Sequence, residues 1–348
     1  MNTFHTLTIQ DITKETADAV SIVFNIPDHL TDTFSFEAGQ YVTLKKIIDG
    51  TEVRRAYSIC SSPKSGVLKV AVKAVENGVF STYATTQLTV GDTLDVHIPE
   101  GKFVLSSEPG KNYLGFAAGS GITPIMSMIK EVLEKGNDAS FTLIYGNKTQ
   151  ADTIFKDELD RLHTDFPNNF NLNYVYSRAR IDGSKNGRID DSIANYYVKN
   201  LYKDVLFESA FLCGPEEMIH TVSDILKDCG FSNDAVLFEL FTASTEEENT
   251  DQITEGASEL TVFLDDEETT FTMQQTDTIL AASLRNDLDA PYSCQGGVCS
   301  SCLGKVTEGK AVMTKNSILT DSEVADGYVL ACQAHPATSK ISIDFDDV

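Results

Sequence analysis

The stretch CQGGVCSSC, residues 294–302, places three cysteines close together. A fourth cysteine follows in VLACQAHP, which gives the spacing Cys294-x4-Cys299-x2-Cys302-x29-Cys332. A tight loop can bring three thiolates to one small volume, and a more distant strand can supply the fourth. Such a loop needs backbone freedom beside the thiolates, which glycine provides. The glycines in these positions are Gly296, Gly297 and Gly304. The pattern therefore predicts a metal centre that four thiolates hold together.

The cysteine spacing resembles that of plant-type ferredoxins, which hold a [2Fe–2S] cluster. The segments CQGGVCSSCLGKVTEGKAVM and DGYVLACQAHPATSKISIDFDDV extend the resemblance over residues 259–348. It implies a β-grasp domain in which backbone N–H groups point at the sulfurs of four cluster ligands. These ligands are Cys294, Cys299, Cys302 and Cys332. A zinc site is the alternative, but structural zinc sites usually take two separate C-x2-C pairs and this module has one.

Composition and charge limit the class of protein. The chain has 348 residues, which predicts two or three domains, and a formal net charge of −25. This charge argues against nucleic acid and anionic membranes as partners. It is typical of a solvated acidic surface, and it would also steer a basic partner towards the protein. No apolar run approaches the ~20 residues of a membrane span, and the first residues lack a signal-peptide pattern. We therefore expect a cytoplasmic protein.

The cysteine count supports the same compartment. Seven cysteines, an odd number, do not suit a closed disulfide framework, and a reducing compartment is expected. Cys60, Cys213 and Cys229 lie outside the set of four. We expect Cys60 and Cys229 to be buried structural residues.

The sequence divides into four parts. Residues 1–108 contain short alternating runs joined by turns, which predicts an antiparallel β-barrel. Residues 109–241 alternate apolar runs with helical patterns, which predicts a parallel sheet with helices on both faces. Residues 242–258 are rich in Glu, Thr and Ser without Lys or Arg, which predicts a flexible acidic linker. Residues 259–348 form the cysteine-containing module.

Apolar patterns place the elements of the second part. Strands are expected at residues 112–119, 140–147, 170–177, 208–214 and 235–241. Helices are expected at residues 123–136, 151–166 and 215–230. Pro124 near the first turn and Gly136 at the end bound the first of these helices. In the first part, a helix is expected only after Ser81.

The run RAYSICSSP, which begins at Arg55, resembles the R-x-Y-S element of the ferredoxin–NADP reductase superfamily. In that family the Arg pairs with a flavin phosphate, the Tyr packs on the isoalloxazine ring and the Ser bonds near N5 of the flavin. The resemblance gives these roles to Arg55, Tyr57 and Ser58, and we add Ala56 and Lys73 to the cofactor-binding set. Taken alone, this run would indicate a strand with an exposed Arg.

The downstream run ENGVFST resembles the second phosphate element of the same family. Gly78 allows close backbone approach, and the next residues open a helix whose N-terminus favours a pyrophosphate. These residues are Val79, Phe80, Ser81 and Thr82. Two phosphate elements imply FAD rather than FMN.

Two further runs resemble the nicotinamide-nucleotide elements of the superfamily. In AAGSGITPIMSM, Gly119 and Gly121 lie between an expected strand and an expected helix, although a lone G-x-G is a weak signal. Thr123 and Pro124 would start the helix and border the flavin. The run FLCGPEEMI resembles the C-G-P element beside the nicotinamide ring. Its matching residues are Cys213, Gly214 and Pro215. A buried structural role is the alternative for Cys213.

The run FELF resembles the E-x-F ending of flavohaemoglobin-type reductases. The resemblance implies that Phe241 shields the flavin where nicotinamide enters and that Glu239 lies nearby. Core packing is the alternative for both residues. The residues expected at the reacting groups are therefore Tyr57, Ser58, Cys213, Glu239 and Phe241.

The run VYSRARIDGSKNGRID lies where the family reads the adenosine ribose. Ser177 and Arg178 match the S-R pair of NADP-using members, and Arg geometry suits a 2′-phosphate. Arg188 joins them in the nucleotide-binding set, and Arg180 and Lys185 add positive charge. The run favours NADPH, with NADH as the alternative. A solvated loop is the plainer interpretation.

Across nearly the whole chain, the domain order and motifs resemble the reductase subunits of phenylacetyl-CoA epoxidases and their relatives. The resemblance implies an oxidoreductase that passes electrons from NADPH through FAD to a [2Fe–2S] cluster and on to an oxygenase component of the di-iron type. The alternatives are a reductase of another aromatic-ring or steroid oxygenase, a general ferredoxin or flavodoxin reductase, and a non-enzymatic iron–sulfur redox sensor.

Overall fold

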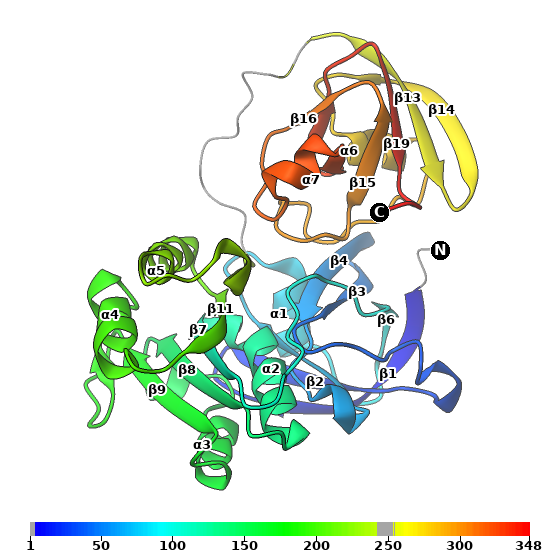
Figure 1. Ribbon diagram of the computed structural model, residues 1–348. Coiled ribbons are helices and arrows are strands. Elements are labelled where there is room, and N and C mark those ends of the chain that lie inside the picture. The colour runs from blue at the N-terminus through cyan, green and yellow to red at the C-terminus, as the bar shows by residue number, and fades with distance from the viewer. Residues whose placement is uncertain (1–3, 242–252, 254) are drawn as a thin grey trace. The chain divides into compact units, whose positions relative to one another are not determined.

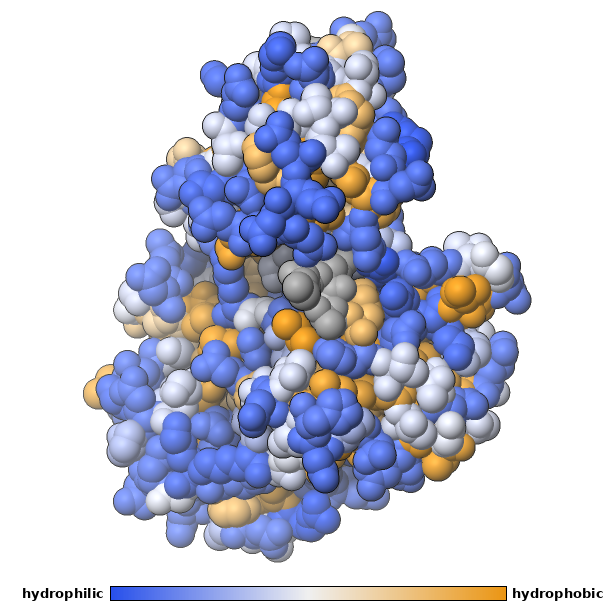
Figure 2. Space-filling model, turned by 90° about the vertical axis from the view of Figure 1, so that its right-hand side faces the viewer, coloured by the Kyte–Doolittle hydropathy of each residue, from blue (hydrophilic) through white to orange (hydrophobic). Residues whose placement is uncertain are grey.

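The computed structural model describes residues 4–241, 253 and 255–348. These residues form two compact units, one made of most of residues 5–241 and the other containing the C-terminal domain (Figure 1). The expected linker falls largely outside the described residues. Polar side chains cover most of the face shown in Figure 2, as the net charge of −25 leads one to expect. Within the described ranges, no helix has the length and apolar character needed to cross a membrane.

The first domain is an antiparallel barrel, as predicted. Its sheet has the order β4-β3-β6-β1-β2-β5, and an isolated antiparallel bridge between Ile59 and Val70 joins the two ends. The strands are β1 Phe4–Lys14, β2 Ala19–Asn25, β3 Tyr41–Ile48, β4 Thr51–Ser58, β5 Leu68–Lys73 and β6 Thr93–His97. Strands β3 and β4 form a hairpin because Asp49 and Gly50 both adopt positive φ, at 50° and 80°, as a two-residue turn of this kind requires.

The second domain is a six-stranded parallel sheet of order β10-β9-β8-β7-β11-β12. The strands are β7 Asn112–Ala118, β8 Ser140–Asn147, β9 Phe170–Tyr176, β10 Lys185–Asn186, β11 Phe207–Cys213 and β12 Val236–Glu239. The helices are α2 Ile122–Lys135, α3 Lys156–Asp165, α4 Asp191–Asn195 and α5 Glu216–Asp228. Right-handed crossovers place α2 and α3 on one face and the packed pair α4 and α5 on the other.

Most expected elements of this domain are present, and the differences have local causes. Helix α2 ends at Gly136, which adopts the left-handed conformation with φ 64°, as predicted. Helix α3 begins only at Lys156, because Gln150–Asp152 form a 3-10 turn and Phe155 has a positive φ of 60°. In the barrel domain, α1 spans Val79–Thr86 and so begins two residues before Ser81.

The C-terminal domain has a five-stranded sheet of order β14-β13-β19-β15-β17, in which β13 and β19 are parallel. A separate pair, β16 and β18, is antiparallel. The elements are β13 Ala257–Leu264, β14 Glu267–Gln274, α6 Ile279–Arg285, β15 Leu303–Glu308, β16 Ala311–Met313, α7 Asp321–Ala325, β17 Tyr328–Leu330, β18 Ala334–Pro336 and β19 Lys340–Asp344. Strand β13 starts two residues inside the segment expected as linker, and Ser258 is already buried.

One continuous core joins the barrel to the parallel sheet. Barrel side chains such as Ala38, Cys60 and Phe103 belong to the same buried cluster as Ile125 and Ile129 of α2. This shared core explains why the two domains form one compact unit. Cys60 is buried, as expected, whereas Cys229 is exposed. The expectation for Cys229 was wrong because this residue caps the end of α5, where the chain turns at the surface.

Candidate functional site

The order of the parallel sheet marks its binding edge. From β7 the chain moves outwards through β8 and β9, and then returns to β11 on the other side of β7. The loops after β7 and β11 therefore leave a crevice at the carboxyl ends of the strands, which is where open α/β sheets bind nucleotides. The expected nicotinamide-nucleotide residues lie in these two loops.

Two glycines let these loops touch. A Cβ on Gly121 would lie 2.0 Å from the carbonyl oxygen of Cys213. A Cβ on Gly214 would lie 3.0 Å from the Cβ of Ala118. The glycines are needed for backbone approach, and the loops hold each other in place. Among the other expected residues, Thr123 donates a hydrogen bond to the Ser120 carbonyl at 3.0 Å, Pro124 is buried, and Pro215 is exposed at the start of α5.

A barrel residue meets the same edge. The hydroxyl of Ser58, at the end of β4, donates to Oε2 of Glu239, at the end of β12, at 3.1 Å. Cys213 pairs with Glu239 across the β11–β12 ladder. Three of the five residues expected at the reacting groups, Ser58, Cys213 and Glu239, are therefore brought together.

Burial controls the protonation of this group. Removal from water raises the pKa of Glu239 from its ordinary value of 4.5 to about 8, although the hydrogen bond from Ser58 lowers it. Burial also raises the pKa of the Cys213 thiol, and the nearby Glu239 carboxylate raises it further. Cys213 is thus a neutral thiol at physiological pH, and Glu239 can hold or release a proton close to neutrality.

The two expected flavin elements also meet. The ring of Tyr57 lies 5.5 Å from the ring of Phe80 in α1. Gly78 is the N-cap of α1, and a Cβ there would lie 2.3 Å from Oγ of Ser81. Ser81 is buried and accepts a hydrogen bond from the Val75 amide at 3.3 Å. The strand end and the helix N-terminus therefore face a common region.

Most of the remaining residues expected to bind the flavin or the nucleotide are exposed or half-buried. Arg55, Val79 and Thr82 are exposed, and Ala56 is half-buried. Lys73 lies 3.7 Å from a carboxylate oxygen of Asp18. Phe241 follows β12 and is 41% exposed, so it is not part of the core.

The arginine-containing loop starts at the same carboxyl edge of the sheet. The amides of Ser177 and Arg178 donate to the carbonyls of Asn147 and Lys148, both at 2.9 Å. The side chains of Arg178 and Arg188 are exposed. This placement leaves both guanidinium groups accessible to a ligand bound at the sheet edge.

The four cysteines of the C-terminal domain are arranged as two pairs. Cys299 donates to the sulfur of Cys294 at 3.0 Å and lowers the pKa of Cys294 to about 6. Cys302 likewise donates to Cys332 and lowers its pKa. Among the described residues, no three His, Cys, Asp or Glu side chains converge as ligands of a single metal ion. Two pairs of thiols suit two irons, each of which needs two thiolates besides the bridging sulfides.

Backbone amides point at these sulfurs. The amide of Gly296 donates to the sulfur of Cys294 at 3.3 Å, and the amide of Gly297 donates to Cys332. Gln295 and Gly297 adopt positive φ, at 54° and 73°, which turns the loop around the thiols. Such donors offset the negative charge of a cluster, so the loop fits a [2Fe–2S] group.

Three family models match consecutive parts of the chain. The oxidoreductase FAD-binding domain matches residues 6–105, and the oxidoreductase NAD-binding domain matches residues 116–224. The 2Fe-2S iron-sulfur cluster binding domain matches residues 262–337. The order of the models is the order predicted from the motifs.

Curated relatives match the chain from end to end. One subunit of the 1,2-phenylacetyl-CoA epoxidase of Escherichia coli (strain K12) is 39% identical over 351 residues, which cover 99% of this chain and 99% of that protein. The chain belongs to this family of modular reductases. The ferredoxin reductase component of the 3-ketosteroid-9-alpha-monooxygenase of Rhodococcus rhodochrous is 34% identical to this chain. The match covers 97% of this chain and 96% of the Rhodococcus protein.

A solved structure shows the same architecture. Phthalate dioxygenase reductase, described as a modular structure for electron transfer from pyridine nucleotides to [2Fe-2S], has a TM-score of 0.62 and 22% identity, with 98% of each chain covered. This chain is therefore an oxidoreductase, and its cofactors are FAD, a pyridine nucleotide and a [2Fe–2S] cluster.

Sequence reasoning missed one residue that supports the nucleotide loop. Tyr145, in the buried strand β8, donates its hydroxyl to the carbonyl of Gly119 at 2.9 Å. No signal in the sequence could have identified this contact, since an aromatic residue in a buried strand indicates only core packing.

Proposed function

We propose that this reductase passes electrons from NADPH through FAD and the [2Fe–2S] cluster to the oxygenase component of a phenylacetyl-CoA epoxidase-type multicomponent enzyme. The observation that carries the proposal is the 39% identity to the Escherichia coli epoxidase component over 99% of both chains. The coarser statement, electron transfer by a flavin and iron–sulfur reductase, also rests on the three domains.

The bound flavin would split a two-electron donation from the nucleotide into single electrons that the cluster can accept. The protein positions the reactants. The paired glycine loops would hold the nicotinamide end at the crevice between β7 and β11. Ser58 donates a hydrogen bond at the barrel side of this edge, and Glu239 stores a proton beside it. Cys213 stays a neutral thiol, so it adds no charge next to the nicotinamide.

The arginine-containing loop supports NADPH over NADH. Ser177 and Arg178 follow β9 at the carboxyl edge, and Arg178, Arg180 and Arg188 are exposed. Exposed guanidinium groups in a protein of net charge −25 suit a 2′-phosphate, which Arg binds through paired hydrogen bonds. An Arg178→Ala variant should raise KM for NADPH and leave KM for NADH nearly unchanged.

The partner is the finer part of the proposal. We propose a di-iron oxygenase component as the acceptor and the cytoplasm as the compartment. The three cysteines outside the cluster set, Cys60, Cys213 and Cys229, are free thiols, which suits a reducing compartment. The 34% identity to a steroid monooxygenase component makes a steroid oxygenase the second candidate.

Reconstitution tests the proposal. The purified reductase should support oxygenation of phenylacetyl-CoA by an epoxidase oxygenase component, with NADPH consumed in step with product. It should support a steroid oxygenase and an aromatic-ring dioxygenase far less well. Equal turnover with all acceptors would favour a general reductase. NADPH oxidation without delivery to any oxygenase would contradict the proposed partner class.

A further inference from the structure

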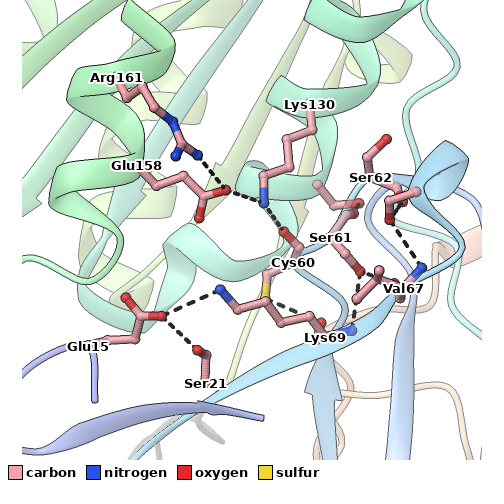
Figure 3. Close-up of polar contacts among 12 residues, drawn as sticks. Glu15, Ser21, Cys60, Ser61, Ser62, Val67, Lys69, Lys130, Glu158 and Arg161 are labelled. Carbon is pink, nitrogen blue, oxygen red and sulfur yellow. Dashed lines mark hydrogen bonds and ion pairs between the residues drawn. The ribbon is translucent and has the colours of Figure 1, made fainter. Parts of the chain in front are cut away.

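Two polar side chains of α2 face the barrel from within the shared core. Ser127 and Lys130 are spaced three apart, so they lie on one face of the helix, and both are buried. The Ser127 hydroxyl donates to the Ser61 carbonyl at 2.7 Å. The Lys130 ammonium donates to the Cys60 carbonyl at 3.0 Å and pairs with Glu158 of α3 at 2.8 Å (Figure 3).

The barrel side of this contact is equally well fixed. The amide of Cys60 donates to the Lys69 carbonyl at 2.9 Å, and the Ser61 hydroxyl donates to the Val67 carbonyl at 2.6 Å. Lys69 in turn lies 3.5 Å from Glu15, whose carboxylate also accepts from Ser21 (Figure 3). The segment Cys60–Ser61 therefore binds β5 with its amide and hydroxyl, and binds α2 with its carbonyls.

This contact lies close to both halves of the reacting site. Ser127 lies six residues after Gly121, about 9 Å along the helix at ~1.5 Å per residue. Ser61 lies three residues after Ser58, about 10 Å along the chain at ~3.3 Å per residue. Any shift of α2 against the Cys60–Ser61 segment would change the distance between the nicotinamide loop and the flavin strand.

A charged residue is well suited to this role. Buried Lys is rare unless it is paired, because a buried ammonium without partners is costly. Lys130 has both a carboxylate and a carbonyl as partners, and these two contacts favour one position of α2 against the barrel. An apolar residue of similar volume would keep the packing but allow α2 to slide.

We propose that Lys130, assisted by Ser127, is a positioning residue that sets the distance between the bound nicotinamide and the flavin. The inference rests on the proposed function, since it concerns the rate at which NADPH reduces the flavin. The polar partners of Lys130 are the Cys60 carbonyl and Glu158. Lys130 acts through the backbone of the segment that follows Ser58.

The test uses Lys130→Met and Ser127→Ala in the full-length protein loaded with FAD and cluster. Anaerobic stopped-flow mixing with NADPH gives the rate of flavin reduction at saturation and the apparent Kd. A displacement of ~1 Å can cost about 100-fold in rate. We expect Lys130→Met to slow reduction by about 10-fold to 100-fold and to weaken the charge-transfer absorbance, with little change in Kd or in bound FAD. Ser127→Ala should shift the rate in the same direction by less.

Matched variants separate positioning from stability. Lys130→Arg keeps the charge and the donor, and should restore most of the rate. Lys135→Met removes a lysine from the same helix whose partner, Glu131, lies on that helix, and should behave as wild type. Should Lys130→Met not fold, Ser127→Ala still tests the inference.

Different results would overturn the positioning role of Lys130 and the proposed function. Reduction of Lys130→Met and Ser127→Ala at the wild-type rate, even with a lower Tm, would overturn the positioning role and leave the proposed function intact. Wild-type protein that neither NADPH nor NADH reduces would overturn the proposed function and this inference with it.

Discussion

At the residue scale, the Ser58–Glu239 hydrogen bond is one contact between the barrel and the carboxyl edge of the sheet. Ser58→Ala removes the donor but leaves the carboxyl group in place. We expect the rate of flavin reduction by NADPH to fall by about 100-fold, the size typical of losing one donor at a reacting centre. Stopped-flow reduction at saturating NADPH measures this effect. Ser65→Ala, in an exposed turn of the barrel, is the control, and an equal loss in both variants would contradict the assigned role.

The protonation of Glu239 gives a second prediction at this scale. Its pKa of about 8 lies above the ordinary value of 4.5, so the folded protein keeps a proton that the unfolded chain releases between these values. The free energy of unfolding should therefore decrease as pH rises from 4.5 to about 8 and then level off. Glu239→Gln cannot ionise and lacks this contribution.

Urea denaturation of the wild type and of Glu239→Gln, at several pH values between 4.5 and about 8, measures how the free energy of unfolding changes with pH. The difference between them isolates Glu239 from the other carboxylates. The free energy of unfolding of the wild type should fall relative to Glu239→Gln as pH rises. A difference that stays constant across the window would show that folding does not raise the pKa of Glu239.

At the element scale, the loops after β7 and β11 contact each other at the proposed nucleotide crevice. In Gly121→Ala, the new Cβ would collide with the Cys213 carbonyl, so one loop must move. We expect KM for NADPH to rise about 10-fold and Tm to fall. Gly136→Ala is the control, because its positive φ is strained by about 1 kcal/mol while no atom lies within 4 Å. Normal KM in Gly121→Ala would mean that the loop contact does not shape the binding site.

The local pattern of apolar residues and glycines predicted most helices and strands. It failed for elements whose conformation depends on tertiary contacts. The buried strand at residues 140–147 and the helix that stops at Gly136 follow from apolar runs and one glycine. Strand β10 has only two residues, and the π-helical turn Tyr196–Leu201 carries no distinct signal, so both were missed.

The candidate site shows the same division. Three of the four cysteines lie within nine residues, and their spacing, glycines and flanking segments predict the cluster type. The Lys130–Cys60 contact joins residues 70 positions apart, and a lysine on a helix indicates only a solvated side chain until the barrel is placed against it.

At the scale of the whole molecule, we predict that the part of residues 242–258 that precedes β13 lets the C-terminal domain exchange between the flavin and the partner. The prediction comes from composition, and most of the segment lies outside the described residues. A protease site introduced at residues 243–252 allows the chain to be cut. Cleavage should leave NADPH oxidation by small dyes intact and stop delivery to the oxygenase. Unchanged electron delivery to the oxygenase after cleavage would contradict this prediction.

The central claim is that electrons from the nucleotide reach the four-cysteine cluster through the flavin. An anaerobic titration of the purified protein with NADPH, followed by visible absorption and low-temperature EPR, tests it most directly. We expect flavin and cluster absorbance to bleach together and a plant-type [2Fe–2S] signal to appear. A protein that contains no flavin, or whose cluster stays oxidised after the flavin is fully reduced, would contradict it.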